Sequence, residues 1–448
     1  MHCERLMTAL VRNEGSKMMG EINLKTFWLI SIFLLVMACA AAAGRTIYVD
    51  DDGPADFSTI QEAIDDSSDA DTIIVQPGLY KEYISFYGKN ITLTSTNPGD
   101  SNVVAATIVE SVRFLGTEDP NCTFTGFKIN DGISGGQNHT HATISHCLLS
   151  GNITYGGTVI WGCDGTISNC VVVDNKPSGH VLGDAIVGCH GLIKNCTIAH
   201  NDAGIAVLEG GTTTIENCII YHNGYGAQVL VISRFGSGAT VNILYSDVQG
   251  GLEGIFLWDE DSIVNWGPGN IDTDPCFVRV GDLFGTFEGD YHLLPDSPCI
   301  NAGDPNYIAE PNETDLDGKP RVIGGRVDMG AYEYRFTISA EARIIPRTIN
   351  PASQGRWITC YIWLPEDYNV ADIDPNSVLL EDEIQVQSLL VDEQEQIAIV
   401  RFNRSEVQSI LNIGRVELTI TGQLTDGTVF VGTDVIRVLN KAGRKSAK

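Results

Sequence analysis

Positive charge is scarce in this 448-residue chain, which has 28 lysine and arginine residues against 57 aspartate and glutamate residues, for a net charge of −29. No arginine occurs between Arg113 and Arg234. A surface of this sign repels nucleic acids and anionic membranes, so neither is an expected partner. It would also repel a polyuronate unless cations bridged the two, although an acidic surface on an exported protein is often only a means of staying soluble.

Long apolar runs are absent after residue 43. The run at residues 27–43 ends in small residues and its strongly apolar part is too short for a membrane span, which is typical of an export signal. We therefore expect residues 1–43 to be a leader, cleaved after Ala43, and no transmembrane span in the mature protein. A Val-Met-Ala sequence before Cys39 faintly resembles a lipoprotein cleavage box, and lipidation there stays open as the less favoured alternative. Met18 or Met19 is a better start than Met1, which makes residues 1–17 an expected artefact of start assignment.

Helical periodicity is lacking from the repeats that follow, where a short β-branched segment recurs. Its copies have cysteines 22 to 26 residues apart, each with isoleucine three positions before and asparagine five positions after. The cysteines are Cys147, Cys170, Cys196 and Cys218, and weaker copies place Phe127 and Ser246 in the same slot. A period in this range indicates stacked units that bury their apolar faces only against their neighbours.

A second strand and a glycine-rich corner follow each copy, which leaves no room for a crossover helix. The Leu-x-x-Leu-x-Leu frame of a leucine-rich repeat is missing, and a propeller blade would need about forty residues. The repeats therefore predict an all-β fold, a parallel β-helix over residues 44–275.

The slot that closes each copy contains only glycine or asparagine. Its residues are Gly132, Asn152, Asn175, Asn201, Asn223 and Gly251. Both residue types reach positive φ at low cost, so we expect a left-handed turn in this slot. Asparagine side chains stacked in one column can also bond to the coils above and below, which predicts a structural ladder.

The cysteines of an exported protein invite a disulfide interpretation. The repeat cysteines, however, occupy one column of stacked strands, and buried free cysteine behaves as a small hydrophobe. We expect them in the core, with Cys163 and Cys189 as a second inward column. Cys276 and Cys299 lie outside these columns and are the best candidates for a bridge, with the free state equally open.

The start of the mature chain has the features of an end cover. Asp56 or Ser58 can cap a short amphipathic helix whose apolar stripe is Phe57, Ile60, Ala63 and Ile64. The pattern Phe-x-Thr-Ile-Gln-x-Ala-Ile, followed by Pro-Gly-x-Tyr-x-Glu, resembles the N-terminal cap of the pectin-lyase-like superfamily of right-handed β-helices. The repeats resemble the β-helix region of that superfamily. Over residues 46–275 this resemblance implies a right-handed parallel β-helix and no particular activity.

The second end of the solenoid also needs a cover. Residues 276–334, with Ser-Pro-Cys-Ile-Asn-Ala-Gly, Asp-Leu-Asp-Gly-Lys-Pro-Arg and Val-Asp-Met-Gly-Ala-Tyr-Glu in order, resemble the choice-of-anchor Q module that ends many bacterial surface β-helix proteins. The resemblance implies a C-terminal cap and an exported bacterial protein at or beyond the cell surface, and it implies no reaction.

Alternating apolar and polar residues return after residue 334. They predict a small β-sandwich over residues 335–440, with a hairpin turn at Asp426-Gly427 and one helix near residues 405–411. Residues 441–448 form a basic tail.

Catalysis on a β-helix would need outward groups on adjacent coils, about 4.8 Å apart per step. The column one place before the asparagine slot contains Asp174, His200 and His222, which could act as base and acid. The competing interpretation is that the flank of a turn is polar by default. Zinc binding through Cys196 with His200, or Cys218 with His222, would require the cysteines to leave the core.

The motifs of known activities in the superfamily are incomplete here. The segment Gly188-Cys-His-Gly191 echoes the polygalacturonase-like members, but no paired aspartates precede it. The Gln-Asp-Thr and Asp-Phe-Ile-Phe-Gly motifs of the pectinesterase-like members are absent, and the arginine of the pectate-lyase-like members has no counterpart between Arg113 and Arg234. None of these activities is carried over.

Asp315 and Asp317 mimic part of the start of a calcium loop that begins at Glu313, but the twelfth position of this loop is Gly324 rather than glutamate. They are the candidate ligands of one structural calcium ion, and no cofactor is otherwise required. The sequence thus favours an exported, surface or secreted monomer that binds polysaccharide or another cell-envelope component. The alternative is a polysaccharide lyase, hydrolase or epimerase that uses Asp174, His200 and His222.

Overall fold

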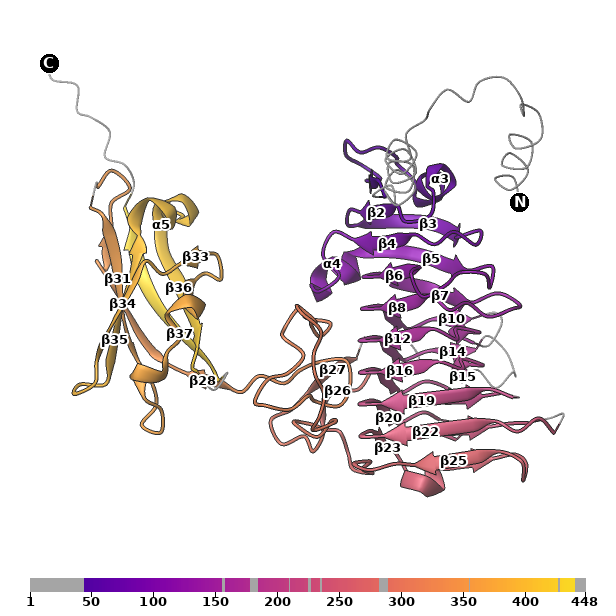
Figure 1. Ribbon diagram of the computed structural model, residues 1–448. Helices are drawn as coiled ribbons and strands as arrows, with labels where there is room; N and C mark the ends of the chain where they lie inside the picture. Colours follow the sequence, from indigo (N-terminus) through magenta and orange to yellow (C-terminus); the bar gives the residue numbers. More distant parts are fainter. Residues whose placement is uncertain are drawn as a thin grey trace, which may run out of the picture.

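The computed structural model describes residues 44–154, 158–177, 184–208, 210–224, 227–233, 236–281, 289–353, 355–425 and 428–439. The expected leader, with its start and cleavage sites, and the basic tail lie outside these residues. Figure 1 shows a stack of coiled strands, a segment beside it and a second unit built from two sheets. In the described part of the chain, no helix is long and apolar enough to cross a membrane.

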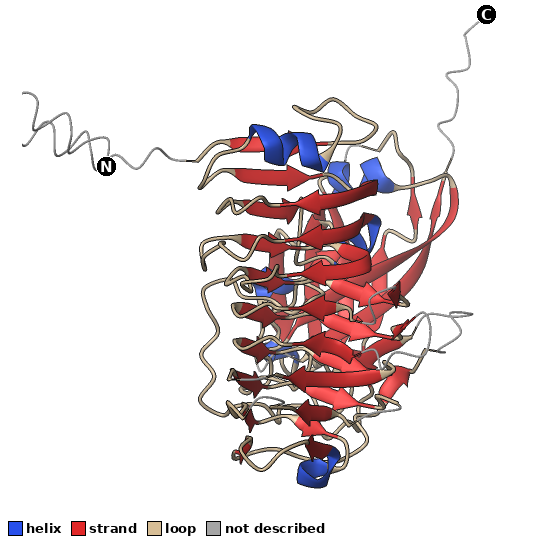
Figure 2. Cartoon of the chain, turned by 90° about the vertical axis from the view of Figure 1, so that its right-hand side faces the viewer, coloured by secondary structure: helices blue, strands red, loops and turns tan. Residues whose placement is uncertain are grey.

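Strands of successive coils pair in parallel and in register, and they form three flanks of the stack (Figure 2). The first, which we call the threonine flank, is a ten-stranded sheet. Its strands are β1 (Thr46–Val49), β2 (Thr72–Val75), β4 (Thr92–Ser95), β6 (Thr123–Thr125), β8 (Thr143–Ser145), β12 (Thr166–Ser168), β16 (Leu192–Lys194), β19 (Thr212–Glu216), β22 (Thr240–Leu244) and β25 (Ile263–Trp266). Each isoleucine of the sequence repeat lies on one of these strands and is buried in the interior.

The other two flanks share the long strands β3 (Gly78–Ser85), β5 (Thr107–Arg113) and β7 (Lys128–Ser134) near the start of the stack. One flank then continues through β9 (Leu148–Ser150), β13 (Val171–Val173), β17 (Thr197–Ala199), β20 (Ile219–Tyr221) and β23 (Asp247–Val248). The other continues through β11 (Ile160–Trp161), β15 (Asp184–Val187), β18 (Ala203–Val207), β21 (Val229–Val231) and β24 (Ile255–Leu257). A small pair, β10 (Ile153–Thr154) and β14 (Lys176–Pro177), lies between them along the chain. The described strands therefore confirm the predicted parallel β-helix.

The interior is a single apolar column in which the repeat cysteines are fully buried. All described cysteines are free, so Cys276 and Cys299 form no bridge. The Sγ atom of Cys299 instead donates to Asp247 at 3.3 Å. Each ladder cysteine donates to the carbonyl two residues before it, as Cys170 does to Ser168 at 3.2 Å. A thiol in this slot thus satisfies a turn carbonyl while it fills the core.

The asparagine ladder is present, with hydrogen bonds running from coil to coil. The Nδ2 atom of Asn175 donates to Asn201 at 2.9 Å, and that of Asn201 donates to Asn223 at 3.0 Å. The predicted left-handed turn is displaced by one residue, because the positive φ values fall on the residues before the asparagines. These are Gly151, Asp174, His200 and His222, whereas Gly132 and Gly251 in the slot itself have the predicted positive φ. The asparagine must turn its amide inward to reach its partners, so the preceding residue makes the turn.

The first end of the stack is covered by the predicted helix, α3 (Ile60–Asp66), whose buried residues are those of the expected stripe. Its N-cap is Thr59, whose side chain accepts from the backbone N–H of Glu62, rather than Asp56 or Ser58. A second short helix that the sequence analysis did not predict, α4 (Ser101–Ala106), packs against β5 and β7.

The segment after the stack lies along its side. Residues 277–281 and 289–334, with β26 (Phe277–Arg279) and β27 (Asp290–Leu293) paired antiparallel at the start, form an apolar cluster with β13, β17 and β20. Figure 1 shows β26 and β27 beside the stack rather than beyond β25 at its end. The sequence analysis expected this segment over the second end; the structure places it on the flank of β9, β13, β17, β20 and β23, which we call the covered flank. The 3-10 helix η1 (Gly251–Gly254) and strands β24 and β25 close the last coil.

The C-terminal unit is a β-sandwich with its own apolar core. Its first sheet contains β28 (Thr337–Ser339), β30 (Thr348–Ile349), β32 (Leu379–Leu380), β33 (Ile384–Gln385), β36 (Gly414–Gln423) and β37 (Val429–Val438). Its second sheet contains β29 (Glu341–Ile345), β31 (Trp357–Trp363), β34 (Ser388–Asp392) and β35 (Ile397–Asn403). The helices are α5 (Arg404–Ile410), close to the predicted range, and the 3-10 turns η2 (Val370–Asp372) and η3 (Pro375–Ser377). The expected turn at residues 426–427 lies outside the described residues, but β36 and β37 on either side pair as a hairpin.

Candidate functional site

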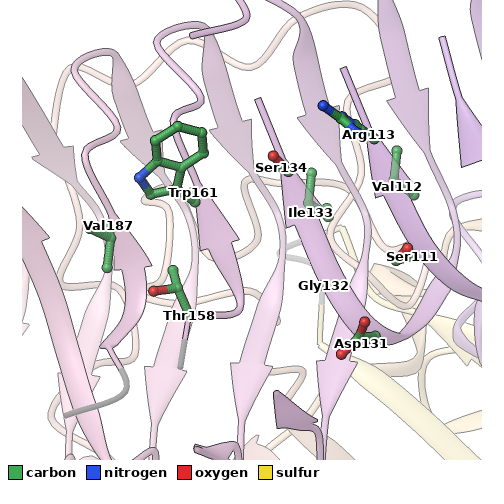
Figure 3. Close-up of a pocket in the computed structure, with 10 residues that line it drawn as sticks. All are labelled: Ser111, Val112, Arg113, Asp131, Gly132, Ile133, Ser134, Thr158, Trp161 and Val187. Atoms are coloured by element: carbon green, nitrogen blue, oxygen red, sulfur yellow. The ribbon is translucent and has the colours of Figure 1, made fainter. Parts of the chain in front are cut away.

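A shallow groove lies on the outer surface of β5, β7, β11 and β15, which with β18, β21 and β24 we call the groove flank (Figure 3). The strand register places Arg113 beside Ser134, Ser134 beside Trp161, and Trp161 beside Val187. These four side chains form one outward row that crosses four successive coils. At about 4.8 Å per coil, the row is about 14 Å long, which suits a chain of sugar units better than a single small ligand.

The groove has a volume of about 540 Å3, within the range of ligand sites in proteins. Its floor is the backbone of β7, where Gly132 is required because a Cβ atom there would lie 2.6 Å from the carbonyl oxygen of Val159. Thr158 and Ser111 contribute hydroxyl groups to the same lining. The indole of Trp161 stands beside Ser134 and Thr158 (Figure 3). An aromatic face with hydroxyl groups around it is the arrangement that stacks on a sugar ring and bonds to its hydroxyls.

Arg113 and Asp131 provide the two charged groups of the lining, toward opposite ends of β7 in Figure 3. Neither side chain makes a hydrogen bond or ion pair with another described residue, so both are available to a ligand. A guanidinium binds a carboxylate or vicinal hydroxyls through two parallel N–H donors. Arg113 is thus the group of this lining that would attract an acidic sugar to a chain of net charge −29.

The lining of the groove does not contain the residue pairs typical of glycoside hydrolysis or of histidine acid–base catalysis. Asp131 is the one carboxylate among its lining residues, whereas glycoside hydrolysis uses two carboxyl groups roughly 5–9.5 Å apart. No histidine lines it to act as a general base or acid.

The structure joins two of the three residues expected in a catalytic column. The Nδ1 atom of His200 lies 2.7 Å from Oδ1 of Asp174. The same carboxylate accepts a hydrogen bond of 2.5 Å from the hydroxyl of Tyr291, which belongs to the segment on the covered flank. Burial raises the pKa of Tyr291, and the adjoining Asp174 carboxylate raises it further, so the phenol remains a donor. Asp174 is therefore 7% exposed and holds the segment against the stack.

His222 lies apart from that pair. Its side chain is exposed, its ring packs beside Tyr221 with 4.9 Å between centroids, and its backbone N–H donates to Gln249. In the described residues it makes no hydrogen bond to Asp174 or His200. The three residues share a column, but they do not converge on one point.

The two candidate calcium ligands are bonded to protein groups. Oδ1 of Asp315 accepts from the backbone N–H groups of Asp317 and Lys319, and its Oδ2 accepts from that of Glu333. Asp317 pairs with Lys319 at 3.0 Å and with His292 at 2.8 Å. Burial alone would raise the pKa of Asp317, but these two partners bring it well below its ordinary value. Calcium at this loop stays a prediction, and it would have to displace Lys319 and His292.

Arg113, Asp131 and Trp161 were not predicted as site residues from the sequence. A signal existed, since Arg113 is the last arginine before a stretch of more than a hundred residues without one. Its alignment with Ser134 and Trp161 could not be read because these residues are 21 and 27 positions apart.

Comparison with known proteins agrees with this architecture. A family model described as a right handed beta helix region matches residues 110–264, a span that includes the four cysteine copies. Residues 110–264 of the chain are therefore similar to right-handed β-helix regions. A stretch of 143 residues, 30% of the chain, is 32% identical to a cell surface glycoprotein of Methanothermus fervidus. It covers 23% of that glycoprotein, so the similarity spans about a quarter of the relative's length.

A similarity to a solved structure was also found. The crystal structure of a pectin methylesterase in complex with a hexasaccharide aligns with 52% of this chain and 92% of that chain, at 13% identity and a TM-score of 0.25.

Proposed function

We propose that this protein is an exported, surface or secreted β-helix module that binds polysaccharide or other envelope material in the groove on β5, β7, β11 and β15. The observation that carries the proposal is the row of Arg113, Ser134 and Trp161 in a groove with a single carboxylate. The predicted leader, the similarity to a cell surface glycoprotein and the resemblance of residues 276–334 to a choice-of-anchor module support an extracytoplasmic location. The protein would act as a monomer, because one groove flank supplies the whole row.

Retention of the purified protein on immobilised neutral and acidic polysaccharides tests this proposal. We expect one or more glycans to retain the protein, and Trp161→Ala to weaken the dissociation constant at least about tenfold, which corresponds to about 1.4 kcal/mol. Trp258→Ala is the matched control, because Trp258 is 63% exposed and lies outside the groove lining. Arg113→Gln should weaken binding to acidic glycans more than to neutral ones.

Equal retention of the Trp161→Ala and Trp258→Ala proteins would move the binding site away from the groove. No retention on any glycan would leave a structural surface protein.

An enzymatic function is the second candidate, and the 2.7 Å contact between His200 and Asp174 is the observation in its favour. A carboxylate that orients an imidazole is a common arrangement for a general base. Reducing-end release from the same glycans, with and without calcium, tests it. Release that His200→Ala and Asp174→Ala abolish would establish an enzyme, whereas unchanged release would place any activity elsewhere. His222→Ala should have the smaller effect, since His222 makes no described contact with this pair.

A further inference from the structure

We propose that His139, Asp164 and His190 form a binding site for one divalent transition-metal ion of the zinc class. The three residues lie at the same corner of three successive coils, where the chain passes from the groove flank to the threonine flank. His139 lies between β7 and β8, Asp164 between β11 and β12, and His190 between β15 and β16. Because successive coils are locked together by the β-ladders on both sides, the three side chains are held in fixed positions.

The potential ligand atoms are close enough to share one ion. Nδ1 of His139 lies 2.9 Å from Oδ1 of Asp164, and Nδ1 of His190 lies 3.5 Å from the same oxygen. Taking one ligand atom from each residue, all three lie within 4.8 Å of one another. Tetrahedral zinc with ligand bonds of about 2.0–2.2 Å separates its ligand atoms by about 3.3–3.6 Å, so shifts below about 1.5 Å would complete the geometry.

The surroundings suit a metal better than a simple surface ion pair. The side chains of His139, Asp164 and His190 are 21%, 20% and 17% exposed, so they are largely desolvated but still reachable from solvent. Two imidazoles and one carboxylate leave the fourth tetrahedral position open to water or to a ligand oxygen. His190 would bind through Nδ1, the nitrogen that faces Asp164, while its buried Nε2 lies on the other side of the ring, toward Gly211.

The local backbone is arranged to bring these side chains together. His139 adopts a left-handed conformation with φ of 58°, which favours glycine or asparagine. The backbone N–H of His190 donates to Oδ1 of Asp164 at 3.0 Å and orients the carboxylate. Gly211 is required beside His190, because a Cβ atom at that position would lie 1.9 Å from the imidazole ring.

The cluster adjoins the proposed glycan groove. The ring of His139 packs edge-on to Trp161, with 5.5 Å between centroids, and faces Gly162 and Gly188. Those glycines directly follow Trp161 and Val187, which line the groove. A bound divalent ion would add two positive charges next to the groove of an otherwise acidic chain. The metal site itself does not depend on glycan binding, and its test is separate.

Calorimetric titration of the chelator-treated, purified full chain with zinc chloride tests the site. We expect one ion per chain for the native protein and at least about 100-fold weaker binding for His190→Ala and for His139→Ala. His141→Ala is the matched control, because His141 is exposed, occupies the same corner and is outside the cluster. Asp164→Asn keeps the shape of the side chain and should also lose binding, which guards against a histidine variant that fails to fold.

Cobalt substitution adds a spectroscopic readout. Tetrahedral cobalt with nitrogen and oxygen ligands gives visible bands without the intense near-ultraviolet charge transfer of thiolate ligands. No binding by the native protein, equal binding by the His141→Ala and His190→Ala proteins, or a thiolate band would each overturn the proposal. The triad would then be a hydrogen-bonded corner.

Discussion

The covered flank and the threonine flank of the same solenoid differ in what their outward residues are. On β13, β17 and β20 three consecutive residues are buried, as in Val171-Val172-Val173 and Ile219-Ile220-Tyr221. On β8 and β16 only the central residue is buried, as in Thr143-Ile144-Ser145. A strand that is apolar on both faces is one that is covered on both faces. The apolar outward residues of the covered flank thus indicate, in the sequence itself, that another segment packs on this flank.

The two flanks also differ in how charge is buried. The segment on the covered flank contains a fully buried Arg321 with Asp328 and Glu333 around it, whereas the central cluster of the solenoid consists of apolar residues and its buried acidic residues, such as Glu118 and Asp247, lie outside that cluster. Burial of an unpaired charge costs far more than loss of an apolar contact. The attached segment should therefore be the part of the β-helix whose stability depends most on single residues and on pH.

Replacement of Arg321 is expected to have the largest effect on stability. Arg321 forms an ion pair with Glu333 at 3.4 Å and donates to the carbonyl of Gly330 at 2.8 Å, and both charged side chains are fully buried. Arg321→Met should lower the free energy of unfolding of this segment by about 3–5 kcal/mol, since it leaves the buried carboxyl groups of Asp328 and Glu333 without their arginine partner. Amide hydrogen exchange of residues 299–333 measures this loss of stability.

The control for Arg321→Met is Arg347→Met, which removes the ion pair of an exposed arginine with Asp434 in the sandwich. It should cost at most about 1 kcal/mol. Equal losses of unfolding free energy in the two variants would mean that the buried ion pair stabilises the fold no more than an exposed one.

Two alanine variants, Ile219→Ala on the covered flank and Leu192→Ala on the threonine flank, test whether the outward residues of the two flanks contribute differently to stability. Ile219 is 1% exposed and meets Gly330 of the attached segment, where a Cβ atom would lie 2.9 Å from its side chain. Leu192 points outward on β16 and is only partly buried. Ile219→Ala should cost about 2–4 kcal/mol and Leu192→Ala about 1 kcal/mol or less in denaturant unfolding. A larger loss for Leu192→Ala would contradict the assignment of the cover.

Asp247, on β23 of the covered flank, predicts a pH dependence. Burial raises the pKa of this carboxyl to about 7, in spite of hydrogen bonds from Thr273 and Cys299. Between the ordinary pKa of about 3.8 and pH 7 the folded state holds a proton that the unfolded state has released. The contribution of Asp247 to the free energy of unfolding should therefore be complete below about pH 3.8. It should be lost as the pH rises through 7, by at most about 1.4 kcal/mol per pH unit.

Thermal unfolding at several pH values checks the effect of Asp247. Asp247→Asn should flatten the decline between pH 4 and 7, whereas Asp296→Asn, at an exposed position, should leave it unchanged. An unaltered slope in the Asp247→Asn protein would assign the decline to other groups.

The smallest effect on stability is expected for a substitution on the groove flank. Arg113 is exposed and makes no described ion pair, so Arg113→Gln should change the free energy of unfolding by no more than about 0.5 kcal/mol. The same variant should weaken binding to acidic glycans. A destabilisation above about 1 kcal/mol would mean that Arg113 supports the fold rather than a ligand.

Much of the solenoid could be predicted because its residues repeat. The cysteine column and the asparagine ladder recur at every coil, so Cys170 and Asn201 could be placed without coordinates. The position of the left-handed turn was predicted one residue too late, because asparagine is also selected for its inward amide. Residues 276–334 were predicted to cover the second end of the solenoid and not its flank, although Ile219-Ile220-Tyr221 indicated a second buried face.

The candidate sites were less accessible to sequence reasoning. Arg113, Ser134 and Trp161 lie in one row because the lengths of the corners bring them into register, and those lengths differ from coil to coil. His139 reaches Asp164 and His190 through a left-handed turn that places it outside the regular column.

The sequence by itself determined the parallel β-helix, its first end cover and its core, because each is specified by a local pattern that the stacking repeats. The tertiary structure alone decided which flank the later segment covers, which surface remains open as a groove and which side chains meet at a corner. Those features depend on contacts between residues far apart in the chain, whose register is set by loops of irregular length and has no period to read.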